Sequence, residues 1–278
     1  MTTVYSAPRP KQKRKFEHFI KQFRLTSKKI GMQANTAYLV RKLNNIFIMK
    51  KEHSDLVKEH FEAKYYDYDA LIRKLIPNYE QMHRSVIDLV DAKSEKPALL
   101  DLGIGTGETA LHLLQKYPQA AIDGFDISPK MIERGKARLQ KESGRVRFTE
   151  QDIKNLDLGD QTYDAGVAVL SVHHLTGEQK QELFEKVFNH LKEGGIFVLG
   201  DIVKFDSDEA TRAKEKEWRA HLIQNLGQEE GQYWFENYLE EDLPSSVNEQ
   251  IQWLRDAGFS DARSAWEYMN YAVFFGRK

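Results

Sequence analysis

Residues 99–107 read Leu-Leu-Asp-Leu-Gly-Ile-Gly-Thr-Gly, a short apolar run that ends in three glycines at alternate positions. The apolar run predicts a buried strand, and the amphipathic pattern of residues 109–116 predicts a helix directly after it. Glycine is needed where a backbone turns sharply and approaches a ligand without a Cβ in the way, and helix N-termini carry unpaired N–H groups that attract polar ligands. The stretch therefore predicts a strand, a tight turn and a helix, with a ligand site at the turn.

Short apolar runs and amphipathic segments alternate from this unit onward. Strands are expected at residues 98–102, 121–125, 146–149, 165–170 and 195–199. The helices between them are expected at residues 109–116, 130–141 and 178–191. Because nearly continuous apolar strands that alternate with helices are typical of a parallel sheet covered on both faces, the pattern predicts a doubly wound, Rossmann-like α/β domain.

The flanking segments complete the expected architecture. Further helices are expected at residues 54–64, 68–75, 79–92, 208–226 and 247–257, with an aromatic-rich stretch at 232–239. The last two strands, 261–268 and 271–276, are joined by a turn so short that they should form an antiparallel hairpin at the sheet edge. We therefore expect a seven-stranded, mostly parallel sheet in a domain of residues 54–278, with a helical cap inserted at about residues 205–246.

An acidic residue stands at the end of the second expected strand. Asp126 follows Gly124-Phe125, at a place where a carboxylate can accept both ribose hydroxyls of a nucleoside. The glycines at 103, 105 and 107 do not have the G-x-G-x-x-G spacing of dinucleotide dehydrogenases. The pattern favours a nucleoside site at the carboxyl ends of a parallel sheet, with a dehydrogenase or a nonenzymatic binding protein as weaker alternatives.

Residues 101–107, Asp126, residues 151–153 and residues 163–175 resemble the successive motifs of class I S-adenosylmethionine-dependent methyltransferases. The resemblance covers about residues 56–278 and implies S-adenosylmethionine as cofactor and S-adenosylhomocysteine as product. It implies that Gly103, Gly105 and Gly107 lie against the methionine part of the cofactor and that Asp126 holds the ribose.

The resemblance also implies contacts at other strand ends. The remaining cofactor-binding candidates are Tyr65, Asp101, Ile127, Asp152, Ile153, Leu170 and Ser171. Asp152 and Ile153 are expected beside the adenine, and Leu170 and Ser171 beneath the sulfonium. Asp101 is expected to orient the glycine loop or to reach the ammonium group of the cofactor.

Three segments narrow the resemblance to a subgroup. The similarity is to bacterial and archaeal proteins often labelled wobble-uridine tRNA methyltransferases, and it lies in residues 60–79, 253–259 and 271–276. Many of these proteins carry the label because they are similar to carboxy-S-adenosylmethionine synthase. That synthase holds the extra carboxylate with an arginine before its penultimate helix. Residues 231–238 here read Gly-Gln-Tyr-Trp-Phe-Glu-Asn-Tyr, without arginine, so the departure favours ordinary S-adenosylmethionine.

The candidates for chemistry follow the fourth and fifth strands. His173 could serve as a general base, because the pKa of a histidine lies near neutrality, and Asp201 is expected just past the fifth strand at the mouth of the site. Packing, loop shape or capping are the alternative roles for both. The candidates for acceptor contacts are Tyr66, His174, Trp218 and Tyr233, with Tyr68, Trp234 and Tyr238 as further aromatic candidates near the pocket or in the cap. No metal site is expected, since no ligand spacing is recognisable.

Charge is distributed unevenly along the 278 residues. Residues 1–51 hold thirteen Lys or Arg against one acidic residue, a charge of +12, whereas the remainder holds 28 against 41, a charge of −13. Phe16, Phe19, Ile20 and Phe23 have helical spacing within the basic part, so residues 1–53 are predicted to be a basic helical extension. Packing of these apolar side chains against the domain, with the charges solvated, is the favoured interpretation, and binding to RNA through residues 9–51, to an anionic membrane surface or to an acidic protein is the alternative.

The absence of cysteine excludes disulfides, thiolate metal sites and a cysteine nucleophile. No apolar stretch approaches the roughly 20 residues of a membrane span, and the first residues lack the apolar core of a signal peptide, so a cytoplasmic location is expected. The overall expectation is a methyltransferase acting on a small molecule, because the acidic body should repel phosphate. A tRNA-modifying or membrane- or partner-anchored methyltransferase is the alternative, and neither the acceptor atom nor the oligomeric state is indicated.

Overall fold

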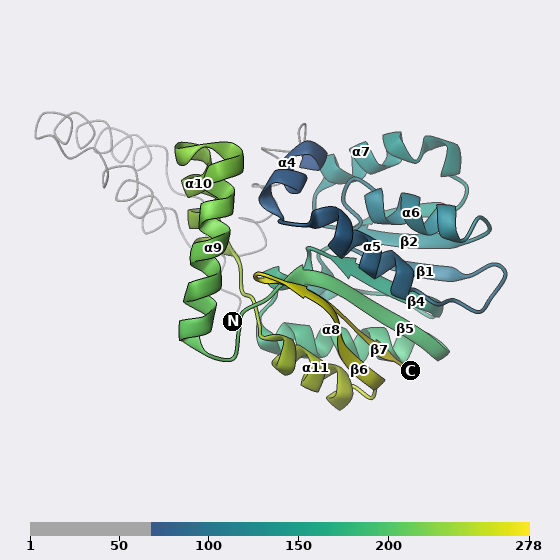
Figure 1. Cartoon of the computed structure of the whole chain (residues 1–278). Coiled ribbons are helices and arrows are strands. Elements are labelled where there is room, and N and C mark those ends of the chain that lie inside the picture. Colours follow the sequence, from purple (N-terminus) through teal and green to yellow (C-terminus); the bar gives the residue numbers. More distant parts are fainter. Residues whose placement is uncertain (1–67) are drawn as a thin grey trace, which may run out of the picture. The chain divides into compact units, whose positions relative to one another are not determined.

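Seven strands of one sheet organise the computed structural model, which describes residues 68–278. The strands are β1 (Ala98–Leu102), β2 (Ala121–Asp126), β3 (Val146–Glu150), β4 (Tyr163–Val169), β5 (Leu191–Ile202), β6 (Ser260–Tyr268) and β7 (Tyr271–Arg277). Their order is β3-β2-β1-β4-β5-β7-β6 (Figure 1). Strands β1 to β5 are parallel, and β7 pairs antiparallel with both β5 and β6. The predicted mixed sheet and its terminal hairpin are confirmed.

Helices cover both faces of this sheet. The α-helices are α4 (Tyr68–Leu75), α5 (Tyr79–Leu89), α6 (Glu108–Lys116), α7 (Pro129–Arg138), α8 (Gly177–His190), α9 (Asp208–Leu226), α10 (Gln228–Glu241) and α11 (Val247–Asp256). Figure 1 shows α4 to α7 over one face, α8 and α11 over the other, and the α9–α10 pair beyond one end of the strands. The fold is thus the doubly wound α/β arrangement that the alternating pattern predicts.

Each face of the sheet contributes to its own apolar core. Leu99 in β1 belongs to the core under α5 and α6, whereas its neighbours Leu100 and Leu102 belong to the core under α8 and α11. This split follows from the alternation of side chains along a strand, and each fully buried Leu contributes roughly 1.5–3 kcal/mol. A sheet buried on both faces exposes its loops at the strand ends, which is where polar side chains gather.

Capping residues set where several helices begin. Thr176 and Gln179 form a reciprocal capping box at the start of α8, and Ser246 and Glu249 do the same for α11. Ser128 caps α7, and its hydroxyl accepts from the N–H of Met131. These signals fix the helix starts next to the loops that carry the candidate site.

Two differences from the sequence prediction lie near the candidate site. Strand β5 runs from Leu191 to Ile202, longer than the expected 195–199, because Leu191 pairs with Tyr163 across a register shift. Asp201 therefore lies inside this strand and not past its end. The aromatic-rich stretch is part of one continuous helix, α10.

Several expectations fall outside the described residues. These are the helix at 54–64, the basic extension 1–53 and the candidates Tyr65 and Tyr66. Within residues 68–278, no helix has the length and apolar character to cross a membrane.

Candidate active site at the carboxyl ends of the strands

The three glycines after β1 all have left-handed backbone angles. The φ angles are +78° at Gly103, +51° at Gly105 and +77° at Gly107. A Cβ on Gly103 would lie 2.4 Å from the Cβ of Ser171, so this glycine is required by packing. A Cβ on Gly105 would lie 3.8 Å from Asp126 Oδ2 and from the carbonyl oxygen of Gly103, an ordinary contact distance, so its positive φ and not packing favours glycine there.

Asp126 is built into the glycine loop. Its Oδ2 accepts from the N–H of Gly105 at 2.8 Å, and its Oδ1 accepts from the N–H of Ser128 at 2.8 Å. Burial raises the pKa of Asp126 to about 6, although these backbone donors favour the charged form. Because each carboxylate oxygen accepts two hydrogen bonds, acceptor positions remain for hydroxyl groups of a ligand.

Asp101 in β1 is a second buried carboxyl group beside this loop. Its side chain is 1% exposed, and its Oδ2 has no hydrogen-bond partner among residues 68–278. Burial, reinforced by the charge of Asp126, raises the pKa of Asp101 to about 8. A buried carboxylate oxygen of this kind fits a cationic ligand group such as an ammonium, which would satisfy it.

The other candidate cofactor residues lie at the ends of β2, β3 and β4. Asp152 caps a short 3₁₀ turn (Ile153–Asn155), where its Oδ1 accepts from the N–H of Lys154 at 3.1 Å. Leu170 has a φ of +53° and lines a cavity described below. The hydroxyl of Ser171 donates to the carbonyl of Leu102 at 2.8 Å, so this residue also ties β4 to the end of β1.

Helix α4 is fastened to the glycine loop by a polar cluster that the sequence analysis missed. The Oδ1 of Asp69 accepts from the hydroxyl of Thr106 at 2.7 Å, and its Oδ2 accepts from Arg134 and Arg138, each at 2.5 Å. Arg138 also donates to the Thr106 hydroxyl at 2.9 Å. These contacts hold the first described turn of the chain over the loop.

A cavity opens beside the site, between α4, the end of β4 and the α9–α10 pair. It encloses about 730 Å³, including its open mouth. Its aromatic walls are formed by Tyr68, Trp218, Trp234, Tyr238 and Tyr271, and its polar lining by His173, His174, Asn237, Glu241 and Asp242. No Lys or Arg of the described chain lines it. Its mainly apolar character is typical of small-molecule sites.

Asp201 acts on the backbone and on His173. Its Oδ2 accepts from the N–H groups of Val172 and His173, both at 2.9 Å, and its Oδ1 contacts His173 Nδ1 and accepts from the N–H of Ile202 at 2.8 Å. Asp201 is 1% exposed and is absent from the cavity lining. These contacts suit a positioning role for Asp201.

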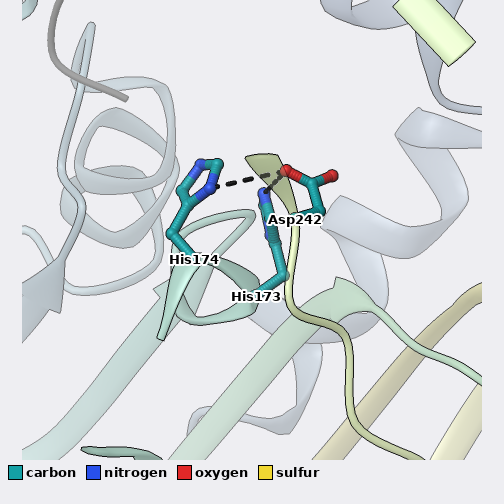
Figure 2. Close-up of side chains that lie close together, drawn as sticks. All are labelled: His173, His174 and Asp242. Carbon is teal, nitrogen blue, oxygen red and sulfur yellow. Dashed lines mark ion pairs between the residues drawn. The ribbon is translucent and has the colours of Figure 1, made fainter. Parts of the chain in front are cut away.

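His173 and His174 lie on a 3₁₀ turn (Val172–His174) beside Asp242 (Figure 2). Asp242 Oδ1 is 3.8 Å from His173 Nε2 and 3.5 Å from His174 Nδ1. Burial alone would lower the pKa of His173, but the carboxylates of Asp201 and Asp242 outweigh it, so the pKa lies above its usual value. Burial raises the pKa of Asp242 to about 6.

Known proteins are similar to this chain in sequence. A family model described as a methyltransferase domain matches residues 99–195. The carboxy-S-adenosyl-L-methionine synthase of Campylobacter hominis is 27% identical over 218 residues, which cover 76% of this chain and 90% of that protein. The family model and this relative support a class I S-adenosylmethionine-dependent methyltransferase.

Solved structures show the same fold at low sequence identity. PigF with S-adenosylhomocysteine has a TM-score of 0.60 at 16% identity, over 84% of this methyltransferase and 65% of that chain. The O-methyltransferase family 2 protein of Planctomyces limnophilus in complex with apigenin has a TM-score of 0.58 at 18% identity, over 88% and 67%. The structural match to human N-acetylserotonin methyltransferase covers 51% of the length of that protein.

The residues of the methyltransferase fit its cofactor. Gly105 donates its N–H to Asp126, Asp126 has acceptor capacity for ribose hydroxyls, and Asp101 offers a buried oxygen to an ammonium group. Since all three lie at neighbouring strand ends, one extended nucleoside ligand can reach each of them.

The cap residues divide into two groups. Trp218 lines the cavity, but its Nε1 also donates to the carbonyl of Leu75 at 2.9 Å, so it joins α9 to α4. Trp234 and Tyr238 line the cavity as well, whereas Tyr233 is not part of the lining and packs against Trp234 at 5.7 Å between ring centroids. Asp242 was missed, because within Glu240-Glu241-Asp242 it looks like part of a solvated acidic run.

Proposed function

We propose that the methyltransferase acts on a small, largely apolar molecule bound in the cavity between α4 and the α9–α10 pair. The observation that carries the proposal is the composition of this cavity, where aromatic side chains form the walls and a few polar groups converge at one side. Leu170 and Tyr68 line the same cavity, and burial, followed by the charge of Asp126, raises the pKa of Tyr68, which supports a cavity next to the expected cofactor position.

The charge of the cavity supports a neutral or cationic acceptor. Glu241 and Asp242 are part of its lining, and no Lys or Arg of residues 68–278 faces them there. An anionic acceptor, or a cofactor that carries an extra carboxylate, would lack a Lys or Arg partner in this lining. We therefore propose that the methyl donor is unmodified S-adenosylmethionine.

Methyl transfer from a sulfonium is an in-line displacement, in which the protein chiefly aligns the nucleophile and excludes water. We propose that Asp101, Gly105 and Asp126 position the donor. The polar group of His173, His174 and Asp242 faces the nucleophilic atom of the acceptor, and Asp201 holds the ring of His173. The remaining predicted donor contacts are Gly103, Gly107, Ile127, Asp152, Ile153, Leu170 and Ser171.

A cytoplasmic location is part of the proposal, as is a domain that begins at residue 54 and carries its cap at residues 205–246. Methyl transfer to a small molecule does not require the basic residues 9–51. Recruitment of RNA through them is the competing outcome of the experiment below.

The experiment uses the full-length chain and S-adenosylmethionine labelled on its methyl group. Neutral phenols, hydroxyindoles and aromatic amines are compared with matched carboxylates and with bulk tRNA. We expect label in at least one neutral or cationic small molecule and none in the carboxylates. Label that enters tRNA alone would overturn the proposal.

Two tryptophan variants locate the acceptor site. Trp234→Ala removes an aromatic wall of the cavity, so the KM for the acceptor should rise about fivefold, on the order of 1 kcal/mol. Trp253→Ala is the matched control, because Trp253 lies in α11 on the opposite face of the sheet. Equal KM values for both variants, with S-adenosylhomocysteine affinity intact in both, would contradict this location.

A further inference from the structure

Three side chains with metal-binding atoms converge at the polar side of the cavity. His173 and His174 come from the turn after β4, and Asp242 comes from the end of α10, about seventy residues later in the chain. One nitrogen of each histidine and one carboxylate oxygen all lie within 4.8 Å of one another. Figure 2 shows both rings directed at the same carboxylate. It is the only such group that the described residues contain.

The separations fit a shared ion. Asp242 Oδ1 is 3.5 Å from His174 Nδ1 and 3.8 Å from His173 Nε2. Nitrogen and oxygen ligands bound tetrahedrally at about 2.0–2.2 Å from one ion lie roughly 3.3–3.6 Å apart. The two distances to the carboxylate are therefore within a few tenths of an ångström of this range, and the two imidazole nitrogens lie within 4.8 Å of one another.

The orientation of His173 is fixed by a carboxylate behind it. Asp201 contacts Nδ1 of His173 and also accepts from the backbone N–H of the same residue at 2.9 Å. Nδ1 is thereby engaged, and Nε2 is the nitrogen that faces Asp242 and the cavity. A carboxylate on the far nitrogen of the ring is the arrangement that orients histidine ligands in metal sites.

Asp242 is also held in place by its neighbours. The N–H of Leu243 donates to the carbonyl of His173 at 2.8 Å, which ties the end of α10 to the histidine turn. The buried Lys180 donates to the carbonyl of Leu243 at 2.6 Å and to the hydroxyl of Ser245 at 2.9 Å. The segment that carries Asp242 is thus fixed beside the histidines by contacts that leave its Oδ1 facing them.

We propose that His173, His174 and Asp242 bind one divalent transition-metal ion at the edge of the acceptor cavity. Two imidazoles and one carboxylate suit Zn²⁺ and its first-row neighbours better than Mg²⁺ or Ca²⁺, which prefer oxygen ligands. Three protein ligands leave at least one coordination position, and the cavity is the space beside them. The site was not apparent in the sequence, because its third ligand comes from another element.

The role of the ion rests on the proposed function. An acceptor hydroxyl that coordinates the ion loses its proton to solvent more readily, because the ion stabilises the oxygen anion. The oxygen lone pair then forms the bond to the methyl carbon, and the carbon–sulfur bond breaks with its electron pair going to sulfur. The sulfonium becomes a neutral thioether, and the acceptor becomes a methyl ether.

The test measures metal content directly. The full-length methyltransferase is stripped with a chelator, equilibrated with Zn²⁺, and analysed for bound zinc by mass spectrometry and by competition with a chelating dye. We expect one Zn²⁺ per chain in the wild type. We expect Asp242→Asn and His174→Ala to weaken zinc binding about tenfold or more. Loss of a residue that only hydrogen-bonds to a metal ligand already lowers metal affinity by about that factor.

Glu241→Gln is the matched control, because Glu241 is the neighbouring acid in the same cavity lining but is not one of the three ligands. It should bind zinc like the wild type. Each variant is also titrated with S-adenosylhomocysteine, to show that the fold and the cofactor site are intact.

Substoichiometric zinc in the wild type, or equal zinc affinity in the wild type and Asp242→Asn, would overturn the metal site. A wild-type protein that methylates a small acceptor without bound metal would refute this inference and leave the proposed function standing. If the protein binds zinc but transfers the labelled methyl group only to tRNA, the proposed function is refuted instead.

Discussion

Asp101 is a buried carboxyl group and Asp126 a half-buried one on the adjacent strand, a costly arrangement for two acidic groups. Burial is the main cause of both raised pKa values, about 8 for Asp101 and about 6 for Asp126. Asp126 is compensated by backbone donors, whereas Asp101 has an oxygen that no described residue satisfies. We interpret this cost as a feature of a site built to receive a cation.

Asp101→Asn tests this interpretation through pH. Since the folded pKa lies above the unfolded value near 3.8, the contribution of Asp101 to stability is fully present below pH 4 and is lost as the pH rises toward 8. The variant should therefore have a free energy of unfolding roughly 1–3 kcal/mol above that of the wild type at pH 8–9. The difference should vanish near pH 4, as measured by denaturant titration.

The same variant should bind S-adenosylmethionine more weakly, because the neutral amide cannot pair with an ammonium group. Asp123→Asn is the control, since Asp123 lies in β2 but pairs with Arg147 away from the loop. Parallel stability–pH curves for the wild type and Asp101→Asn would show that Asp101 is not a strained buried acid.

The α9–α10 pair is the element that shapes the acceptor cavity. It supplies Trp218 and Trp234, and Asp242 directly follows it. Gly231 permits its close packing, because a Cβ there would lie 2.6 Å from the backbone nitrogen of Ile223.

Gly231→Ala should force α9 and α10 apart. We expect a loss of about 1–3 kcal/mol in the free energy of unfolding and a higher KM for the acceptor, with S-adenosylhomocysteine affinity unchanged. Gly144→Ala is the control, since a Cβ there meets nothing within 4 Å, and its effect should stay within about 0.5 kcal/mol. Thermal melts and kinetics that do not separate the two variants would disprove the packing role.

Across the molecule, local signals were sufficient for the elements and for the strand-end loops. Residues 68–75 and 208–226 form the expected helices, because their patterns are strongly periodic or well capped. The extension of β5 was missed, since Lys192-Glu193-Gly194 looks like a turn and joins the strand only through pairing with β4.

The contacts that complete the site could not be predicted, because they join segments far apart in the sequence. Asp69 meets Arg138 across 69 residues, and Asp242 reaches the histidines from a helix whose acidic end looks solvated. A local pattern carries no information on such pairs. The family motifs gave the candidate donor residues, while the polar side of the acceptor cavity emerged only in three dimensions.

The central claim is that an adenosyl ligand lies across the carboxyl ends of β1 and β2, held by Asp126. Isothermal titration of the full-length chain with S-adenosylhomocysteine tests it, with Asp126→Ala compared against Asp123→Ala on the same strand. We predict one site per chain, weakened by about 1.5–3 kcal/mol in Asp126→Ala and unchanged in Asp123→Ala. Absence of binding to the folded wild type, or equal affinity in all three proteins, would contradict the account.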